Sequence, residues 1–307
     1  MKKIINLIIM FLILYITLQV LINSSEVVKA VVFSIDIFKN SVFPSLFPFL
    51  VLSSLLINYG FVELCAKFFK PIMNHLFKMN ANAAFVFVMS LLSGFPSNSK
   101  YTKELYLKGV LTEDEASKIL MFTHFSNPLF ILGTVGIFLN NQKIALLVLF
   151  CHYITNVIIG LIFRKLSPSK ETNVTFDRKP LSFGNALREA TTNAINTLLL
   201  ILGTITVFLV LSTIINKQFS LPPFIQTMIS GLLEMTQGLK YASLLNVDLR
   251  TKAILMTMFL SFGGLSVHMQ VLSIISDTKI KYFPFFIARL IHMAISGILV
   301  FILYSFI

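Results

Sequence analysis

The chain has 307 residues, of which 56% are hydrophobic and only 12% are charged. Soluble domains carry about 25% charged residues, so this composition excludes a soluble globular protein and indicates a polytopic membrane protein. The formal net charge is +12, but the basic residues stand between apolar runs. That arrangement is typical of positive-inside topology rather than of nucleic-acid binding. The two cysteines, Cys65 and Cys151, lie in apolar surroundings and suggest neither a disulfide framework nor a metal motif.

The N-terminal stretch predicts an uncleaved anchor helix over residues 1–24. Two lysines precede an apolar run of about 20 residues, which suits a membrane span better than the short core of a signal peptide. Residues 27–40 mix charged with apolar side chains and are expected to lie along the outer interface. Residues 43–60 then return through the membrane, and the amphipathic stretch 61–79 is expected on the cytoplasmic surface.

Four polar breaks interrupt apolar runs, at residues 94–100, 125–130, 231–238 and 261–270. Non-helical backbone at membrane depth is tolerated only where it is buried in protein or lines a cavity. The first and third breaks follow apolar segments too short to span, which predicts two re-entrant hairpins. The second and fourth predict two broken transmembrane helices. Two breaks in each half therefore indicate a binding site near the middle of a membrane protein.

Helix signals and charge complete the predicted topology. Thr112 and Glu115 have the spacing of a capping box at the start of the first broken helix. Residues 164–188 are polar and basic, which predicts a cytoplasmic loop. The sequence thus predicts an all-α polytopic membrane protein with about seven full spans, built as an inverted repeat. The predicted units are the anchor helix 1–24, a first repeat 25–165, a cytoplasmic linker 166–188 and a second, inverted repeat 189–307.

Glu234 is the most informative single residue, because it is an acidic residue in an otherwise apolar run. A carboxylate at membrane depth costs about 3 kcal/mol on insertion scales and is by default a functional residue. It can bind a coupling cation, relay a proton or hydrogen-bond a solute; the alternative is a structural, hydrogen-bonded glutamate. His268 is either a proton carrier or a satisfied structural histidine. Arg289, on one helical face with His292, is either a snorkelling anchor or a partner of a substrate anion.

Enzyme motifs are absent from the sequence. There is no Gly-x-Ser-x-Gly, Walker A or His-Glu-x-x-His pattern, and the five histidines lack metal-ligand spacing. No enzyme activity, organic cofactor or metal is predicted, and H⁺ and Na⁺ are the candidates for a coupling ion. The expected partners are a small-molecule solute and the lipid bilayer, with no nucleic acid and with a homo-oligomer left open.

The motifs also resemble those of a known family, the YlbJ-like sporulation integral membrane proteins, which belong with the nucleoside-recognition or gate-domain proteins. The resemblance runs from about residue 27 to the C-terminus and rests on FPSLFPFLVLSSLL, GFPSNSK, TEDEASKIL, SNPLFILGTVG, GLLEMTQG and FGGLSVHMQV, in that order. The family is similar in design to concentrative nucleoside transporters, with paired hairpins and broken helices around a midplane solute site. The resemblance implies two gate-type repeats and a role in moving dipicolinic acid across the outer forespore membrane.

Carried over by position, the resemblance implies a solute site made of Gly94, Pro96, Ser97, Asn98, Ser126, Asn127, Glu234, Thr236, Gln237, Gly263, Gly264, Ser266, His268 and Gln270. Family members often have P-S-G-A and N-S-G-P where this chain has residues 96–99 and 125–128. The lost glycines change how closely a solute approaches the backbone. The expected function is secondary transport of a small polar or anionic aromatic solute by alternating access. A nucleoside transporter and a non-transporting membrane scaffold for sporulation are the alternatives.

Overall fold

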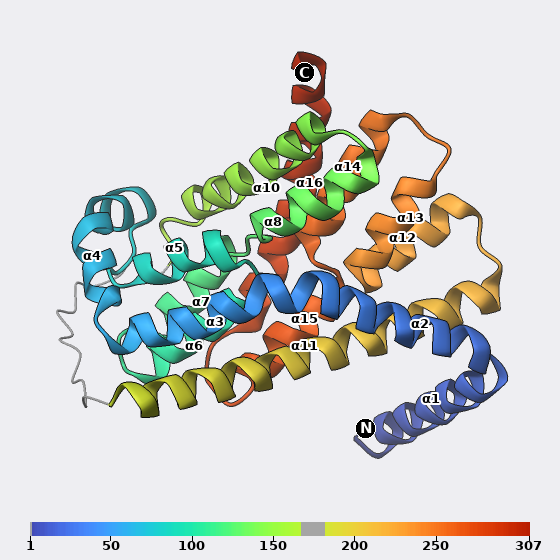
Figure 1. The fold of residues 1–307 in the computed structure, drawn as a ribbon, viewed down its shortest axis with the longest axis horizontal. Helices are drawn as coiled ribbons and strands as arrows, with labels where there is room; N and C mark the ends of the chain where they lie inside the picture. The colour runs from blue at the N-terminus through green and yellow to red at the C-terminus, as the bar shows by residue number, and fades with distance from the viewer. Residues whose placement is uncertain (1, 167–181) are drawn as a thin grey trace.

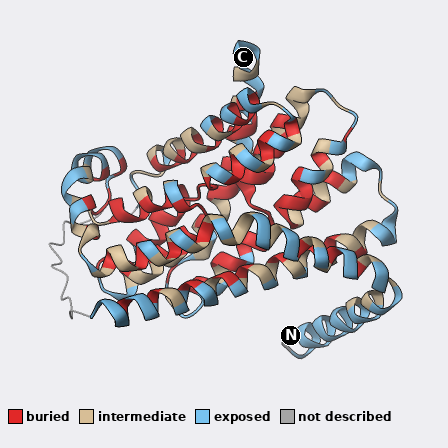
Figure 2. Cartoon of the chain, in the orientation of Figure 1, coloured by how far each residue is buried: buried red, intermediate tan, exposed pale blue. Residues whose placement is uncertain are grey.

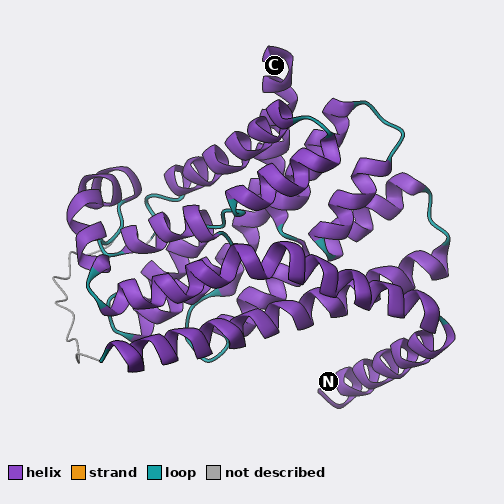
Figure 3. Ribbon diagram, viewed as in Figure 1, coloured by secondary structure: helices purple, strands orange, loops and turns teal. Residues whose placement is uncertain are grey.

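A computed structural model of the chain describes residues 2–166 and 182–307. The described residues form helices joined by short loops and contain no β-strand (Figure 3). The helices up to residue 166 are α1 (Lys2–Ile22), α2 (Ser24–Ile37), α3 (Phe43–Asn58), α4 (Phe61–Pro71), α5 (Ala83–Ser93), α6 (Ser97–Leu107), α7 (Glu113–Phe122), α8 (Pro128–Phe130), α9 (Gly136–Leu139) and α10 (Gln142–Ile162). Those from residue 182 are α11 (Phe183–Phe219), α12 (Pro223–Leu233), α13 (Met235–Leu244), α14 (Leu249–Phe262), α15 (Gly264–Ile275) and α16 (Tyr282–Leu303).

Six helical stretches in the described part of the chain are long and apolar enough to cross a membrane. A bilayer core about 30 Å thick needs about 20 residues of helix, and each of these stretches has at least that many. They confirm the prediction of an all-α polytopic membrane protein. Seven spans were predicted, and the one that these six stretches do not include covers residues 112–139. Its break divides it into α7 and the short α8–α9 segment. It reaches the length of a span only when the two pieces are taken together.

The prediction of an interfacial segment at residues 27–40 is wrong. α2 continues through a π-helical turn, Phe38–Val42, directly into α3, so that Ser24–Asn58 is one stretch of 35 residues. The wide turn comes just before Pro44, and the Phe43 amide reaches back to the Phe38 carbonyl. A wider turn accommodates a proline that lacks an amide donor, which explains why the helix continues instead of ending there.

α11 begins inside the predicted cytoplasmic linker. This helix has 37 residues and starts at Phe183, so residues 183–188 are helical and the predicted boundary at 188 is too late. Residues 167–181 of the predicted linker lie outside the described residues. Buried positions recur every three or four residues along α11, from Ala186 through Ala194 to Leu209. This spacing gives one apolar stripe, which packs along α2 and α3 (Figure 1).

Two helical hairpins approach the middle of the molecule from opposite ends (Figure 1). In the first, α5 and α6 are joined by residues 94–96; in the second, α12 and α13 are joined by Glu234 alone. Each arm has 10 or 11 residues, too few to cross a bilayer. Both predicted hairpins are therefore present as helix–turn–helix units. The relation of the two halves as an inverted repeat stays a prediction.

The two predicted broken helices are also interrupted near their middle. α7 ends at Phe122 and α8 begins at Pro128, whereas α14 and α15 are separated only by Gly263. The capping box at the start of α7 is confirmed, because the Glu115 amide lies 3.3 Å from Thr112 Oγ1 and the Thr112 amide lies 2.9 Å from Glu115 Oε2. Of the four polar breaks, those at the hairpins are called hairpin turns from here on. The name first break is kept for residues 123–127 of the first broken helix, and the name second break for residues 263–264 of the second broken helix.

Burial is concentrated around the hairpins and the breaks, and α1 lies outside this core (Figure 2). None of the apolar window of α1 is buried against protein. Its exposed leucines and isoleucines match a helix surrounded by lipid, since lipid tails solvate apolar side chains as well as a protein interior does.

Ion pairs join the two halves of the chain at one end of the bundle. Lys103 Nζ on α6 lies 2.7 Å from Asp277 Oδ1 in the loop before α16. Lys281 Nζ, in the same loop, lies 3.1 Å from Glu113 Oε1 and 3.0 Å from Asp114 Oδ1 at the start of α7. The loop at 276–281 is therefore held against the first hairpin and the first broken helix.

Candidate functional site

The first hairpin packs its turn directly against the first break. The Phe95 amide donates to the Phe125 carbonyl at 2.7 Å. A Cβ atom added at Gly94 would lie 2.5 Å from the backbone nitrogen of Asn127, so only glycine fits there, and its φ of +78° also favours glycine. The Asn127 amide donates to the Leu92 carbonyl at 3.1 Å, and its Oδ1 caps the start of α8. The hairpin and the break are thus joined by a backbone hydrogen bond, a close backbone approach and a side-chain hydrogen bond.

The second hairpin turns on Glu234, whose carboxylate caps the helix that follows. Glu234 Oε2 accepts from the Gln237 amide at 3.0 Å and from the Thr236 hydroxyl. An acceptor at a helix N-terminus satisfies a free amide and faces the positive end of the helix dipole. A Cβ atom at Gly264 would lie 3.0 Å from the Met235 nitrogen, so the second break packs against this turn as the first break packs against the first hairpin.

His268 is fully engaged by contacts within the protein. Its Nε2 lies 3.1 Å from the Phe262 carbonyl, which is freed by the second break, and its Nδ1 lies 2.7 Å from the Tyr282 hydroxyl. A carbonyl can only accept, so in the neutral ring Nε2 carries the proton and Nδ1 accepts from the tyrosine. This geometry matches the structural interpretation of His268.

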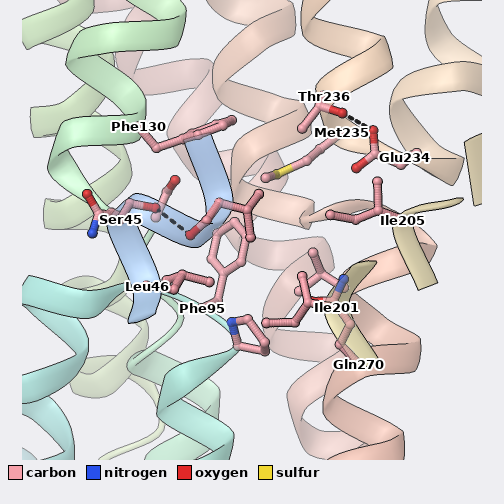
Figure 4. A pocket seen from close by; sticks show the side chains of 15 residues that line it. Ser45, Leu46, Phe95, Phe130, Ile201, Ile205, Glu234, Met235, Thr236 and Gln270 are labelled. Carbon is pink, nitrogen blue, oxygen red and sulfur yellow. Dashed lines mark hydrogen bonds between the residues drawn. The ribbon is translucent and has the colours of Figure 1, made fainter. Parts of the chain in front are cut away.

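A small cavity lies where the two hairpins and both broken helices meet (Figure 4). Its volume is about 50 Å³. In Figure 4, Glu234, Met235 and Thr236 stand on one side of the cavity, opposite Ser45 and Leu46. The side chains around it come from the π-helical turn Phe38–Val42, α3, α8, α11, α15, both hairpins and the first break. They are Val42, Ser45, Leu46, Phe95, Pro96, Ser126, Asn127, Phe130, Ile201, Ile205, Glu234, Met235, Thr236, Val267 and Gln270.

Six of the residues predicted for the solute site line this cavity: Pro96, Ser126, Asn127, Glu234, Thr236 and Gln270. Five others form the surrounding turns and helix starts, namely Gly94, Gln237, Gly263, Gly264 and His268. The remaining three, Ser97, Asn98 and Ser266, are buried near the starts of α6 and α15.

All three residues are at most 1% exposed. Asn98 carries two side-chain polar atoms, Oδ1 and Nδ2, that have no hydrogen-bond partner among the described residues. Both ring nitrogens of the buried His124 share this property. Buried polar groups in proteins are normally paired, so a water molecule or a polar solute would find ready partners here.

Sequence reasoning missed the apolar wall and the polar residues behind the first break. Phe95, Phe130 and Ile205 line the cavity but look like any lipid-facing or core residue in the sequence. His152 and Asn156 on α10 contact the first break, and their only sequence signal is a polar pair four residues apart in an apolar helix.

Arg289 is not a snorkelling anchor. It is fully buried, and His292 Nδ1 lies 2.6 Å from its guanidinium. A snorkelling side chain needs to reach water, and Arg289 points instead into the centre of the bundle, where it also donates to the Met121 carbonyl.

The fold and the cavity define a class of protein: a polytopic helical membrane protein with two opposed re-entrant hairpins around a buried polar centre. Comparisons with known proteins agree with this class. The nucleoside recognition (Gate) family model matches residues 40–169. The sporulation integral membrane protein YlbJ of Bacillus subtilis (strain 168) is 30% identical over 345 aligned positions, which cover 99% of this chain and 84% of that protein. The chain belongs to the YlbJ family of sporulation integral membrane proteins. No solved structure matches it.

Proposed function

We propose that the protein is a secondary transporter that moves a small polar or anionic aromatic solute across the membrane by alternating access. The single observation that carries this proposal is the cavity between the two hairpins and the two breaks. Opposed hairpins give a solute two potential routes, one towards each side of the membrane. The cavity combines an apolar wall with a few polar groups, a combination typical of small-molecule sites.

The size of the cavity limits what it can hold in the present arrangement of the hairpins. A volume of about 50 Å³ holds a few water molecules. An aromatic solute therefore requires one hairpin to move away from its break. Such movement is the opening step of alternating access, and it would expose the buried polar groups of Ser97, Asn98 and Ser266 to the solute.

Dipicolinic acid is the first candidate solute, because the chain belongs to a sporulation family and the site combines aromatic side chains with hydrogen-bond donors. In that role the protein would act in the outer forespore membrane. A nucleoside is the second candidate, favoured by the match to the nucleoside recognition family model. A coupling H⁺ or Na⁺ is part of the proposal, with Glu234 as the group that would bind it. A non-transporting scaffold is the alternative outside transport.

Binding of dipicolinate and of uridine to the detergent-purified protein tests the proposal. Gln270→Leu removes a cavity-lining amide and is expected to weaken binding about fivefold, the value of one hydrogen bond. The matched control is Gln226→Leu on α12, which makes the same change at a position outside the cavity lining and is expected to leave affinity unchanged.

Glu234→Gln separates the two solutes. An anion is repelled by a carboxylate, so dipicolinate should bind the amide variant as tightly as the wild type or more tightly. A neutral nucleoside loses a strong acceptor and should bind more weakly. Saturable binding of neither solute would overturn both candidates. Normal spore formation with Glu234→Gln and Gln270→Leu together would favour the scaffold.

A further inference from the structure

The backbone of the first break depends on partners from outside its own segment. Residues 123–127 lie between α7 and α8 and lack the pairing of a continuous helix. The Phe125 carbonyl is satisfied by the Phe95 amide. The carbonyls of His124 and Ser126 and the amide of Ser126 are instead satisfied by side chains. At membrane depth such groups cannot turn to water, so these side chains determine the path of the break.

All three of those side chains come from one helix, α10. The Ser126 amide donates to His152 Nε2 at 2.8 Å. The Tyr153 hydroxyl lies 2.9 Å from the Ser126 carbonyl and 2.9 Å from the Leu91 carbonyl of α5, which share its one proton. The side-chain amide of Asn156 donates to the His124 carbonyl at 2.9 Å. Because Nε2 of His152 accepts, its Nδ1 carries the proton and donates to Ser261 Oγ at 3.0 Å. Each side chain therefore has one orientation that serves the break.

A second helix, α16, contacts two of these residues from behind: the side chain of Asn156, and the ring and backbone carbonyl of His152, whose ring stacks on that of His292 at 4.7 Å between centroids. Arg289 lies 3.3 Å from Asn156 Oδ1, which leaves the amide nitrogen of Asn156 directed at the break. His292 Nδ1 accepts from Arg289 at 2.6 Å, so its Nε2 carries the proton and donates to the His152 carbonyl at 2.9 Å. Arg289 also donates to the Met121 carbonyl in the last turn of α7.

Stability alone does not explain a buried arginine in this place. Arg289 and His292 are fully buried, and no carboxylate contacts the guanidinium in the described part of the chain. Burying a charge without an opposite charge opposes folding. The hydrogen bonds of Arg289 to Met121 and Asn156 lead instead to groups that end α7 or orient α10.

We infer that Arg289 and His292 are positioning residues for the first break. They act through Asn156 and His152 and hold Ser126 and Asn127 at the wall of the cavity. This inference rests on the proposed solute site for its functional meaning. The inference connects α16 to the first broken helix. A substitution in α16 is therefore expected to change solute binding at the cavity.

Asn156→Asp separates positioning from stability. The carboxylate keeps an acceptor for Arg289 and gives it a counter-charge, but it removes the donor to the His124 carbonyl. We expect unchanged or higher thermal stability, together with about tenfold faster amide hydrogen exchange confined to residues 123–127. Dipicolinate affinity should fall about fivefold. Tyr153→Phe, which leaves Arg289 untouched, should likewise speed exchange in this segment and at the adjoining end of α5, where the Leu91 carbonyl loses the same hydroxyl.

The control is Asn193→Asp on the exposed face of α11, which should change neither exchange nor affinity. Unchanged exchange at residues 123–127 in both variants would overturn the inference. So would faster exchange spread equally over α7 and α10 with lower thermal stability, since that is the result of a purely structural network. If the wild type binds no dipicolinate, that candidate solute is wrong, and the exchange measurement on the solute-free protein still decides the positioning role.

Discussion

Glu234 combines two tasks in one side chain. It is the only non-helical residue between α12 and α13, with φ −143° and ψ 115°, and its carboxylate caps α13 while lining the cavity. An uncompensated carboxylate at membrane depth costs about 3 kcal/mol. The helix N-terminus compensates part of that cost through the Gln237 amide. The residue is therefore structural and placed at the candidate solute site at the same time.

Replacing Glu234 by alanine should lower the free energy of unfolding by about 1 kcal/mol, because the start of α13 loses its cap. Glutamine keeps an oxygen acceptor for the Gln237 amide and should lose less. Thermal unfolding in detergent, with both variants beside the wild type, measures the difference. Equal stability of the alanine and glutamine variants would contradict the capping role.

Single polar residues in the site were predictable, and their apolar neighbours were not. Glu234 and Ser126 stand out because polar groups are rare in apolar runs. Phe130 and Ile205 do not, because in a membrane protein an apolar residue can face lipid, core or cavity with the same sequence pattern. Asn156 is likewise a polar residue in an apolar helix, but its partners Arg289 and His124 follow only from the fold.

At the scale of elements, glycine sets the spacing of the second hairpin. A Cβ atom added at Gly238 would lie 2.2 Å from the Cα of Gly231, so the arms α12 and α13 touch through backbone. Phe259 of α14 covers the same contact, because a Cβ at Gly231 would lie 2.5 Å from its ring. Close backbone approach at small residues is a usual way for helices to pack in membranes.

Gly238→Ala should therefore push the two arms apart. We expect a loss of stability of about 1–3 kcal/mol, the usual cost of overpacking, and a loss of solute binding because Glu234 moves with the arm. Gly203→Ala on α11 is the matched control, since a Cβ there meets nothing within 4 Å. Thermal unfolding and dipicolinate binding measure both effects. A tolerated Gly238→Ala would show that the arms can separate without consequence.

The elements were predicted well where polar residues mark a turn, and poorly where they do not. The hairpin turns and the second break lie within the stretches that the sequence indicated, and the first break at 123–127 begins two residues before its predicted stretch, 125–130. The sequence did not predict that α2 continues into α3 as one helix, because the charged residues Lys29, Asp36 and Lys39 suggested a surface segment. A helix can carry such residues at its end and still continue into the membrane, and sequence periodicity does not report that change of depth.

At the scale of the whole molecule, the halves meet along packed helices, with α11 against α2 and α3 and α16 against α7 and α10, and also at the ion pairs around residues 276–281. The class of protein was predictable from composition alone, since few charges and long apolar runs leave little else. The ion pairs were not predictable, because they join residues about 170 positions apart.

The Lys103 ammonium, hydrogen-bonded to Asp277, holds the pKa of that carboxyl below its ordinary value. A lowered pKa means that the contact stabilises the folded state above the pKa of the unfolded chain, and that this contribution is lost as pH falls through the folded pKa. Carbon NMR of labelled aspartate should show Asp277 titrating below the usual range, and closer to it in Lys103→Ala. An identical titration in both proteins would contradict the pair. High salt should weaken it, since both groups reach water.

α1 differs from every other long apolar helix in that no residue of its apolar window is buried by the described protein. A helix whose neighbours are lipid chains is not required to match the shape of any particular surface. To lie in the bilayer, α1 has to be long and apolar, and many different sequences of apolar residues meet that requirement. Many apolar substitutions in α1 are therefore expected to leave the fold unchanged. A single extra methyl group at Gly238, by contrast, would push α12 and α13 apart. Natural variants are expected to accumulate along α1 and to be rare in α12–α15.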